Sequence, residues 1–201
     1  KEVSECLKLA TKYKIGIVPW SGGTGLVGGQ IAPDKYSVTL SVERMNNIKN
    51  FSSINQSVEV EAGVILETIH EFVDKRNFLY PLSMASKGTC CIGGNLATNA
   101  GGIGVLKYGN ARDLCLGLEV VLADGSIIND IKTLKKDNTG YDLKNLFIGS
   151  EGSLGIITRA VLRLYPTPQN KVVVFFGSQN FNAALKSYLE ISKRFGQDLQ
   201  A

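Results

Sequence analysis

The feature that most constrains this chain is a glycine-rich segment, residues 19–29, which reads PWSGGTGLVGG and follows the apolar run at residues 15–18. Glycine lets the backbone bend into conformations that other residues avoid, and it lets a ligand touch bare main-chain amides. A loop of exposed N–H groups binds anions, above all phosphates. The segment therefore predicts a loop that holds a nucleotide by its phosphate groups.

Residues 23–28 match G-x-G-x-x-G, the fingerprint of NAD-binding proteins. That fingerprint functions only where a helix opens inside it and points its N-terminus at the pyrophosphate. Here the glycines at its end are poor helix formers, Pro33 follows, and residues 36–42 alternate as a strand does. Glu43 lies at the spacing of a ribose-binding acid, but without the helix an NAD site is disfavoured.

Composition limits the remaining classes. The chain has 201 residues, of which 44% are hydrophobic and 20% charged, so it can bury a core and is not disordered. A net charge of +4 is too mild to indicate a nucleic-acid partner. No apolar run reaches the roughly 18–20 residues that span a bilayer. The chain starts without Met and within a helical pattern, so we expect an N-terminal part to be missing. Cys6, Cys90, Cys91 and Cys115 form no C-x-x-C pair and are expected to be small apolar filler in a reducing compartment.

Hydrophobic periodicity predicts an alternation of helices and strands. Helices are expected over residues 3–13, 64–77 and 181–195, and strands over residues 15–18, 36–41, 57–62, 114–123, 126–129, 156–165 and 171–176. Short helices are expected to begin near Gly94 and to end near Phe147. His70, the single histidine, lies at the edge of a helical apolar face and is expected to be a surface or satisfied residue rather than a ligand. The Pro166 and Pro168 pair marks a domain boundary.

Two further glycine clusters follow the first, at residues 88–104 and 148–155. Of the 22 glycines, 19 lie between Gly22 and Gly155. A loop as long as residues 88–104 in a compact domain is usually functional. Several glycine clusters suit a long ligand that the backbone contacts in several places, and FAD is such a ligand, with an adenine end, a pyrophosphate, a ribityl chain and a flat flavin.

Three motifs carry a family resemblance: P-x-S-G-G-T-G at residues 19–25, I-G-G-N-x-x-T-N-A-G-G at 92–102, and D-N-T-G-Y-D-L followed by G-S-E-G-S-L-G-I-I-T within 137–158. They resemble the FAD-binding domain of the vanillyl-alcohol oxidase (PCMH-type) superfamily, and within it the D-2-hydroxyglutarate dehydrogenases, the D-lactate dehydrogenases and the D subunit of glycolate oxidase. The resemblance implies an α+β fold. Two α/β subdomains would form the FAD-binding domain over residues 1–165, and residues 166–201 would start an α+β substrate (cap) domain that the chain does not complete.

The resemblance also implies which residues contact FAD. They are Trp20, Ser21, Gly22, Gly23, Thr24, Gly25, Leu26, Gly28 and Gly29 at the pyrophosphate; Pro81, Leu82, Gly88, Thr89, Gly93, Gly94, Asn95 and Thr98 along the ribityl chain and flavin; and Glu151, Gly155, Ile156 and Ile157 at the adenosine. Some relatives attach the flavin through a histidine in the first loop. This loop has none, so FAD is expected to be non-covalent.

The activity implied is oxidation of a D-2-hydroxy acid, D-2-hydroxyglutarate or D-lactate, to the 2-oxo acid by hydride transfer to the flavin. An FAD subunit of a glycolate oxidase complex is the nearest alternative; an NAD-type enzyme and a non-catalytic nucleotide-binding module remain. Hydroxyglutarate enzymes tend to carry a histidine near Cys91 and an arginine near Gly104, so the substrate stays open. Catalytic residues and a divalent metal are expected in a C-terminal half beyond residue 201. An electron-transfer flavoprotein or quinone acceptor, a homo-oligomer, and a location in the bacterial cytoplasm or the mitochondrial matrix are also expected.

Overall fold

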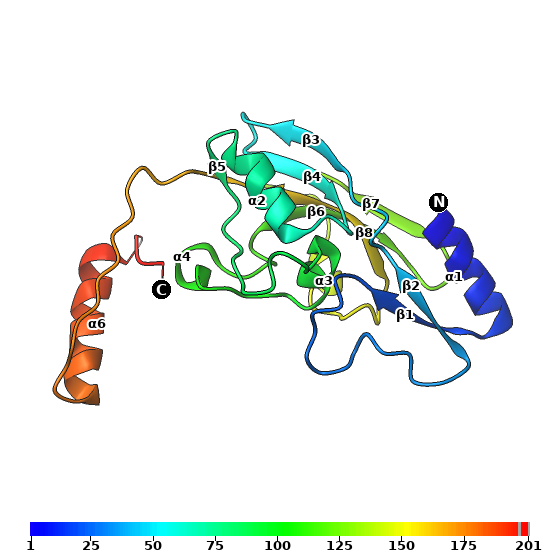
Figure 1. Ribbon diagram of the computed structural model, residues 1–201. Helices are drawn as coiled ribbons and strands as arrows, with labels where there is room; N and C mark the ends of the chain where they lie inside the picture. The colour runs from blue at the N-terminus through cyan, green and yellow to red at the C-terminus, as the bar shows by residue number, and fades with distance from the viewer. Residues whose placement is uncertain (197, 201) are drawn as a thin grey trace.

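Five antiparallel strands form the main sheet, in the spatial order β3–β4–β8–β6–β7 (Figure 1). Their bounds are Ile48–Ser52 for β3, Ser57–Glu61 for β4, Cys115–Val121 for β6, Ile127–Asp130 for β7 and Ile156–Arg163 for β8. β8 is the central strand, paired with β4 on one side and with β6 on the other. The structure is a computed structural model that describes residues 1–196 and 198–200.

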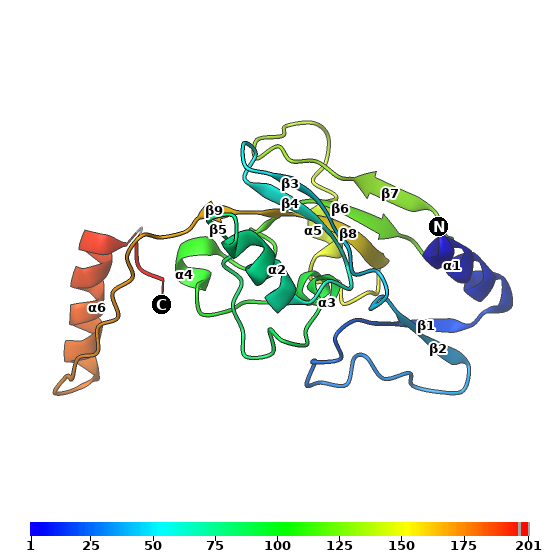
Figure 2. The same ribbon diagram turned by 45° about the horizontal axis from the view of Figure 1, so that its top comes forward.

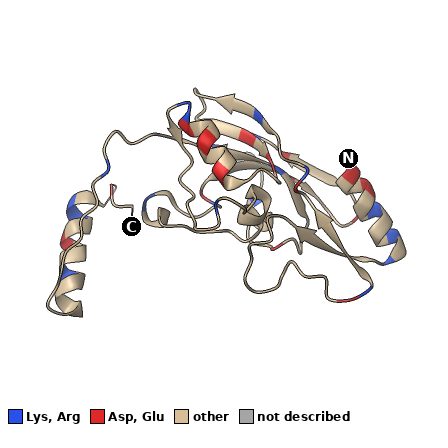
Figure 3. Ribbon diagram, viewed as in Figure 1, with Lys and Arg blue, Asp and Glu red and all other residues tan. Residues whose placement is uncertain are grey.

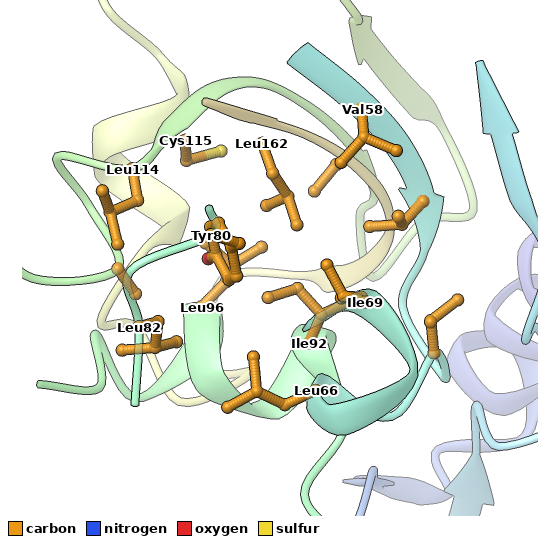
Figure 4. Close-up of a cluster of buried hydrophobic side chains, with 14 of the residues drawn as sticks. Val58, Leu66, Ile69, Tyr80, Leu82, Ile92, Leu96, Leu114, Cys115 and Leu162 are labelled. Atoms are coloured by element: carbon orange, nitrogen blue, oxygen red, sulfur yellow. The ribbon is translucent and has the colours of Figure 1, made fainter. Parts of the chain in front are cut away.

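One face of the sheet is apolar and is covered by the helices α2 (Leu66–Asp74) and α3 (Ile92–Ala97), as Figures 1 and 2 show. The strands contribute alternate residues to this face, so that Val58 pairs with Leu162 and Val60 with Ala160. α2 contributes Leu66 and Ile69, which are fully buried beside Ile92 of α3 (Figure 4). Each such aliphatic side chain contributes about 1.5–3 kcal/mol on burial, which makes this layer the core of the protein.

The opposite face of the sheet carries an ion-pair network. Arg159 of β8 lies between two carboxylates of the neighbouring strands, with Nη1 2.7 Å from Glu59 Oε1 and Nη2 2.5 Å from Glu119 Oε2. Thr158 also donates to Glu119 Oε1 at 2.7 Å. The hydrogen bond from Arg159 is the largest influence on Glu119 and lowers the pKa of that carboxyl. Charge pairing therefore contributes to holding the strands together on this face.

A smaller unit precedes the sheet in the chain. It consists of α1 (Glu2–Tyr13), β1 (Gly16–Trp20) and β2 (Ser37–Ser41), and the two strands are parallel, with Gly16 paired to Ser37 and Trp20 to Ser41. Parallel strands need a crossover of a dozen or more residues, usually a helix. Here the crossover is the glycine-rich segment and contains no helix, as expected from its sequence.

A second apolar cluster joins this unit to the main sheet. Leu7 of α1 and Val42 after β2 pack with Val121 and Ile156, which end β6 and begin β8. The helix α1 is also tied to the turn between β6 and β7, because Ser4 donates to the carbonyl of Gly125. The two units therefore meet along one edge.

The remaining elements are short, except for the last helix. They are β5 (Phe78–Leu79), which pairs with β9 (Tyr165–Pro166), α4 (Val105–Tyr108), α5 (Lys144–Phe147) and α6 (Phe181–Phe195). Figure 1 shows α6 set apart from the two units, at the end of an extended segment. No residue of α6 is buried. Among the described residues, no helix combines the length and the hydropathy that crossing a membrane requires.

Most of the predicted elements are present in the structure, and three expectations need correction. Residues 171–176 form no strand; all are exposed and have no strand beside them in the described chain, and a strand forms only where its backbone groups find a partner. The short apolar run at residues 15–18 predicts a buried strand, but β1 is exposed at Gly16 and half-buried from Ile17 to Trp20. The helix expected near Gly94 begins earlier, at Ile92. The mixed helix and strand content confirms the predicted α+β class.

Candidate functional site

A cavity of about 450 Å³ opens where the glycine-rich crossover, α3 and the start of β8 meet. Its wall contains most of the residues that the resemblance assigned to cofactor binding. These are Trp20, Ser21, Gly22, Gly23, Thr24, Gly25, Leu26, Gly29, Gly93, Gly94, Asn95, Thr98, Glu151, Gly155, Ile156 and Ile157. The fold thus brings together three stretches that are more than fifty residues apart along the chain.

The crossover, most of whose residues line this cavity, has unused main-chain hydrogen-bond donors. Within the described residues, no main-chain N–H from Ser21 to Gln30 donates to another main-chain group. Buried or half-buried N–H groups without partners cost free energy, so they require water or a ligand. Consecutive free amides can together form a donor surface of the kind that binds phosphate oxygens.

The donor surface is not accompanied by charged side chains. Residues 15–33 contain no Asp, Glu, Lys or Arg, and Figure 3 shows the crossover uncoloured over most of its length. Any attraction for an anion along this loop therefore comes from main-chain dipoles. The half-buried indole of Trp20 and the buried side chains of Ile156 and Ile157 supply an apolar part of the wall.

Several glycines of the predicted site are required by packing, whatever the ligand. A Cβ on Gly22 would lie 2.3 Å from the carbonyl oxygen of Thr89, one on Gly93 would lie 2.7 Å from the Cβ of Ala62, and one on Gly155 would lie 2.7 Å from Val120 Cγ1. The absence of a side chain at these glycines therefore allows the segments that form the cavity wall to pack closely. Gly29 differs, because a Cβ there would meet no atom within 4 Å. Gly29 is thus free to face a ligand.

Side chains at the base of the cavity join the first two glycine clusters. The Ser21 hydroxyl oxygen accepts the N–H of Gly94 at 3.1 Å, at the start of α3. Burial raises the pKa of the neighbouring Cys91 thiol, which is therefore neutral near pH 7, although the Ser21 hydroxyl acts in the opposite direction. Asn95 is 5% exposed, and its Oδ1 has no hydrogen-bond partner among the described residues. A buried acceptor of this kind at a cavity wall fits a ligand that donates a hydrogen bond.

Five predicted contacts lie outside this cavity. Pro81 lines a second cavity, of about 600 Å³, next to α2. Leu82 is buried in the main core, where its carbonyl oxygen is 2.9 Å from His70 Nε2, so the histidine is satisfied as expected. Gly28, Gly88 and Thr89 line neither cavity. Their roles toward a cofactor stay predictions.

The cavity wall also contains residues that sequence reasoning missed. Val42, Met84 and Cys91 contribute apolar surface, and Gln30 and Gly152 also line the cavity. Val42 follows β2 and Met84 lies in an irregular segment, so no pattern along the chain marks them. The sequence marks Cys91 as apolar filler and as a position near which the hydroxyglutarate enzymes tend to carry a histidine, but not as a cofactor contact; all four cysteines are free, and three of them are buried.

The comparisons with known proteins agree with this geometry. Residues 1–130 match the model of the family described as FAD binding domain. The chain is 43% identical over its whole length to the mitochondrial D-2-hydroxyglutarate dehydrogenase of Rattus norvegicus, and 40% identical to a putative mitochondrial D-lactate dehydrogenase of Schizosaccharomyces pombe. It spans 37% and 38% of these relatives, which is much less than their full length.

A solved structure shares the fold. An alkyldihydroxyacetonephosphate synthase superposes with a TM-score of 0.74 over 84% of this chain and 33% of its own, at 27% sequence identity. The free amides of the crossover and the unpartnered acceptor of Asn95 fit a long ligand with phosphate and donor groups. The family match, the whole-chain similarity and the shared fold lead to one conclusion: the chain belongs to the FAD binding domain family, of the PCMH type.

Proposed function

We propose that this chain holds FAD non-covalently in the 450 Å³ cavity and is the FAD-binding part of an enzyme that oxidises a D-2-hydroxy acid. The observation that carries the proposal is the uninterrupted run of free main-chain amides from Ser21 to Gln30. A pyrophosphate offers oxygens along such a run and compensates the unpaired donors. The loop contains no histidine, which supports non-covalent binding.

The three parts of the wall have different chemistry, and each suits a different part of FAD. The crossover offers donors and suits the pyrophosphate. The stretch from Gly93 to Thr98 offers the unpartnered acceptor of Asn95 and suits the ribityl hydroxyls beside the flavin. The Glu151 carboxylate and the apolar Ile156 suit the adenosine, which has hydroxyl donors and a flat apolar ring.

The flavin supplies the hydride acceptor, and this chain supplies position and electrostatics. Ser21 and Gly94 fix the crossover to α3, so the donor surface is set before the ligand arrives. The neutral thiol of Cys91 and the indole of Trp20 exclude water from the wall. The substrate proposed is D-2-hydroxyglutarate or D-lactate, since relatives that carry those substrate names are similar over the whole chain.

We further propose that residues 1–165 are the FAD-binding domain and that residues 166–201 begin a cap domain over the substrate. The extended segment at 171–176 supports this boundary, because its valines and phenylalanines are exposed, Val173 at 95% and Phe175 at 102%. The catalytic base and a divalent metal belong to the part of such an enzyme that follows. An electron-transfer flavoprotein or a quinone as acceptor, a homo-oligomeric state, and a mitochondrial matrix location in a eukaryote complete the proposal.

The test is a visible spectrum of the protein purified at its natural length. A flavin absorption band that denaturation releases as free FAD is the expected result. Adding D-2-hydroxyglutarate, D-lactate or glycolate in turn identifies the substrate as the one that bleaches the band. A colourless protein that does not take up added FAD would refute the proposal, and bleaching by glycolate alone would assign the chain to a glycolate oxidase.

Two valine variants assign the site. Gly29→Val fills open space at the cavity wall, and Gly177→Val fills open space in the extended segment away from it. Loss of bound FAD in Gly29→Val but not in Gly177→Val is expected. Equal FAD content in both variants would contradict placement of the pyrophosphate along the crossover.

A further inference from the structure

Glu151 has an unusual backbone conformation at the wall of the cavity. Its φ is 53°, in the left-handed region, and the same turn contains left-handed Gly149 and Gly152, at φ 84° and 81°. Glycine adopts this conformation freely, whereas other residues pay about 1–3 kcal/mol for it. The Glu151 side chain is thus carried by a turn in which glycine would be free of backbone strain.

The Glu151 side chain is free to serve a ligand. It is exposed, it lines the cavity, and it forms no ion pair with any residue in 1–196 or 198–200. An ionised carboxylate only accepts hydrogen bonds, and it repels phosphate. The ligand group beside it must therefore be a donor, such as a sugar hydroxyl or an amine.

The strained turn is fastened to the end of α3. The N–H of Gly149 donates to the Leu96 carbonyl at 3.1 Å, and the N–H of Glu151 donates to the Ala97 carbonyl at 2.9 Å. The last carbonyls of a helix have no partner within it, so these bonds cap α3 with residues from a distant part of the chain. Movement of the turn would therefore leave the Ala97 carbonyl of the cavity wall without its partner, whereas the Leu96 carbonyl would keep the N–H of Asn99, at 3.0 Å.

Arg112 forms hydrogen bonds on both sides of this junction, to the segment before the turn and to the residue that follows the end of α3. Its guanidinium donates from Nη1 to the Asn145 carbonyl at 2.6 Å and from Nη2 to the Ile148 carbonyl at 2.5 Å, directly before the strained turn. Its main-chain N–H donates to the side-chain oxygen of Asn99, at 3.0 Å, just after α3. Asn99 is itself left-handed, at φ 47°.

All hydrogen bonds that the guanidinium forms within the described residues go to Asn145 and Ile148. Arg112 is half-buried, it does not line the cavity, and it forms no ion pair within the described part of the chain. A Cβ on Gly149 would lie 3.2 Å from its Nη2, so the guanidinium also packs over the turn. A planar fork with fixed donors can serve two carbonyls at once, which a lysine ammonium does less well.

We propose that Arg112 is a positioning residue that holds the Glu151 carboxylate toward a hydrogen-bond donor of the bound cofactor. The inference rests on the proposed function, because it takes the ligand of the cavity to be FAD. Arg112 acts without touching the ligand: it fixes the Gly149–Gly152 turn, and the turn fixes Glu151. Its contribution to affinity therefore exists only while residue 151 has a side chain that can reach the ligand.

A double-mutant cycle on FAD affinity tests this dependence. FAD is titrated into cofactor-free protein of natural length and followed by flavin fluorescence, with Arg112→Lys and Glu151→Gly as single and combined variants. Each single variant is expected to weaken FAD binding about tenfold. Arg112→Lys is expected to have no further effect in the Glu151→Gly background, while its effect on thermal stability persists there. An equal loss of affinity in both backgrounds would show that Arg112 supports only the fold, and would overturn the proposal.

Glu151→Gly keeps the proposal testable even if Arg112→Lys fails to fold. Glycine relieves the left-handed strain, so the cofactor-free variant should melt at the same or a higher temperature than wild type and yet bind FAD less tightly. FAD binding as tight as in wild type would overturn the proposal.

Arg76→Lys is the matched control, since Arg76 donates to the carbonyl of Phe72 in α2 at 2.7 Å, away from this cavity, and should leave FAD affinity unchanged. If wild-type protein takes up no FAD, the proposed function itself fails, and the two failures are thereby distinguished.

Discussion

The substitution Gly22→Ala tests whether this glycine is needed for packing of the cavity wall or only for contact with a ligand. A Cβ on Gly22 would lie 2.3 Å from the Thr89 carbonyl oxygen, 2.7 Å from Cys90 Cα and 2.8 Å from Cys91 N. All three are backbone atoms, so no side chain can rotate away. To reach ordinary contact near 3.4 Å, the crossover and the segment before α3 must separate by about 1 Å.

Overpacking of this kind costs about 1–3 kcal/mol. Replacing glycine by alanine returns about 0.4–1 kcal/mol, because it restricts the unfolded chain. The net expectation is a destabilisation of about 1–2 kcal/mol, which for a protein of this size lowers Tm by roughly 2–8 °C. Gly29→Ala meets open space and should change the stability of the cofactor-free protein by less than about 0.5 kcal/mol.

Both variants are compared with wild type in cofactor-free form by thermal unfolding and by urea titration at one pH. Gly22→Ala should lose stability whether or not FAD is present. A Gly22→Ala protein as stable as wild type would refute the packing argument, and it would return Gly22 to the set of residues whose small size serves only the ligand.

Two further predictions concern stability away from the cavity. Arg159→Met leaves the carboxylates of Glu59 and Glu119 without their shared partner on a half-buried face, and should lower the free energy of unfolding in urea by about 2–3 kcal/mol. The control Lys8→Met removes an exposed ion pair and should lower it by less than about 0.5 kcal/mol. Similar losses in the two variants would contradict the role of the network. Burial lowers the pKa of His70 below its ordinary value of 6.5, so folding favours the neutral ring, and stability should fall as the pH drops through 6.5 toward the lower folded-state pKa. Unfolding at pH 7 and pH 5 should show a smaller loss for His70→Gln than for wild type, and equal losses would remove His70 as the cause.

Local sequence patterns were sufficient where a single element determines its own structure. The apolar periodicity of α6 predicted its bounds, and the Asp124–Gly125 pair predicted the turn between β6 and β7, where Gly125 has a φ of 81°. β3 was missed because its pairing with β4 shifts register between Ile48 and Phe51. That irregularity breaks the period of two by which strands are recognised.

Patterns failed where structure depends on a partner. The apolar run at 171–176 has strand-forming residues but no neighbouring strand in the described chain, so it stays extended and unpaired. The glycine clusters predicted the cavity, yet sequence could not distinguish Gly22, which packs against backbone, from Gly29, which faces open space. Met84 and Arg112 carry no motif, because only the fold brings them to the cavity and to its supporting turn.

The position of β8 in the sheet has a consequence for biosynthesis. β4 and β6 are both paired to β8, and β8 leaves the ribosome after all four of the strands that surround it. Until then the nascent chain holds two strands with apolar faces and unsatisfied edges, separated by more than fifty residues. Long-range antiparallel pairing of this kind is slow, and open edges recruit other chains. Ribosome-bound chains in which β8 has not yet left the ribosome should therefore depend on chaperones for solubility, and those in which β8 is fully outside should not.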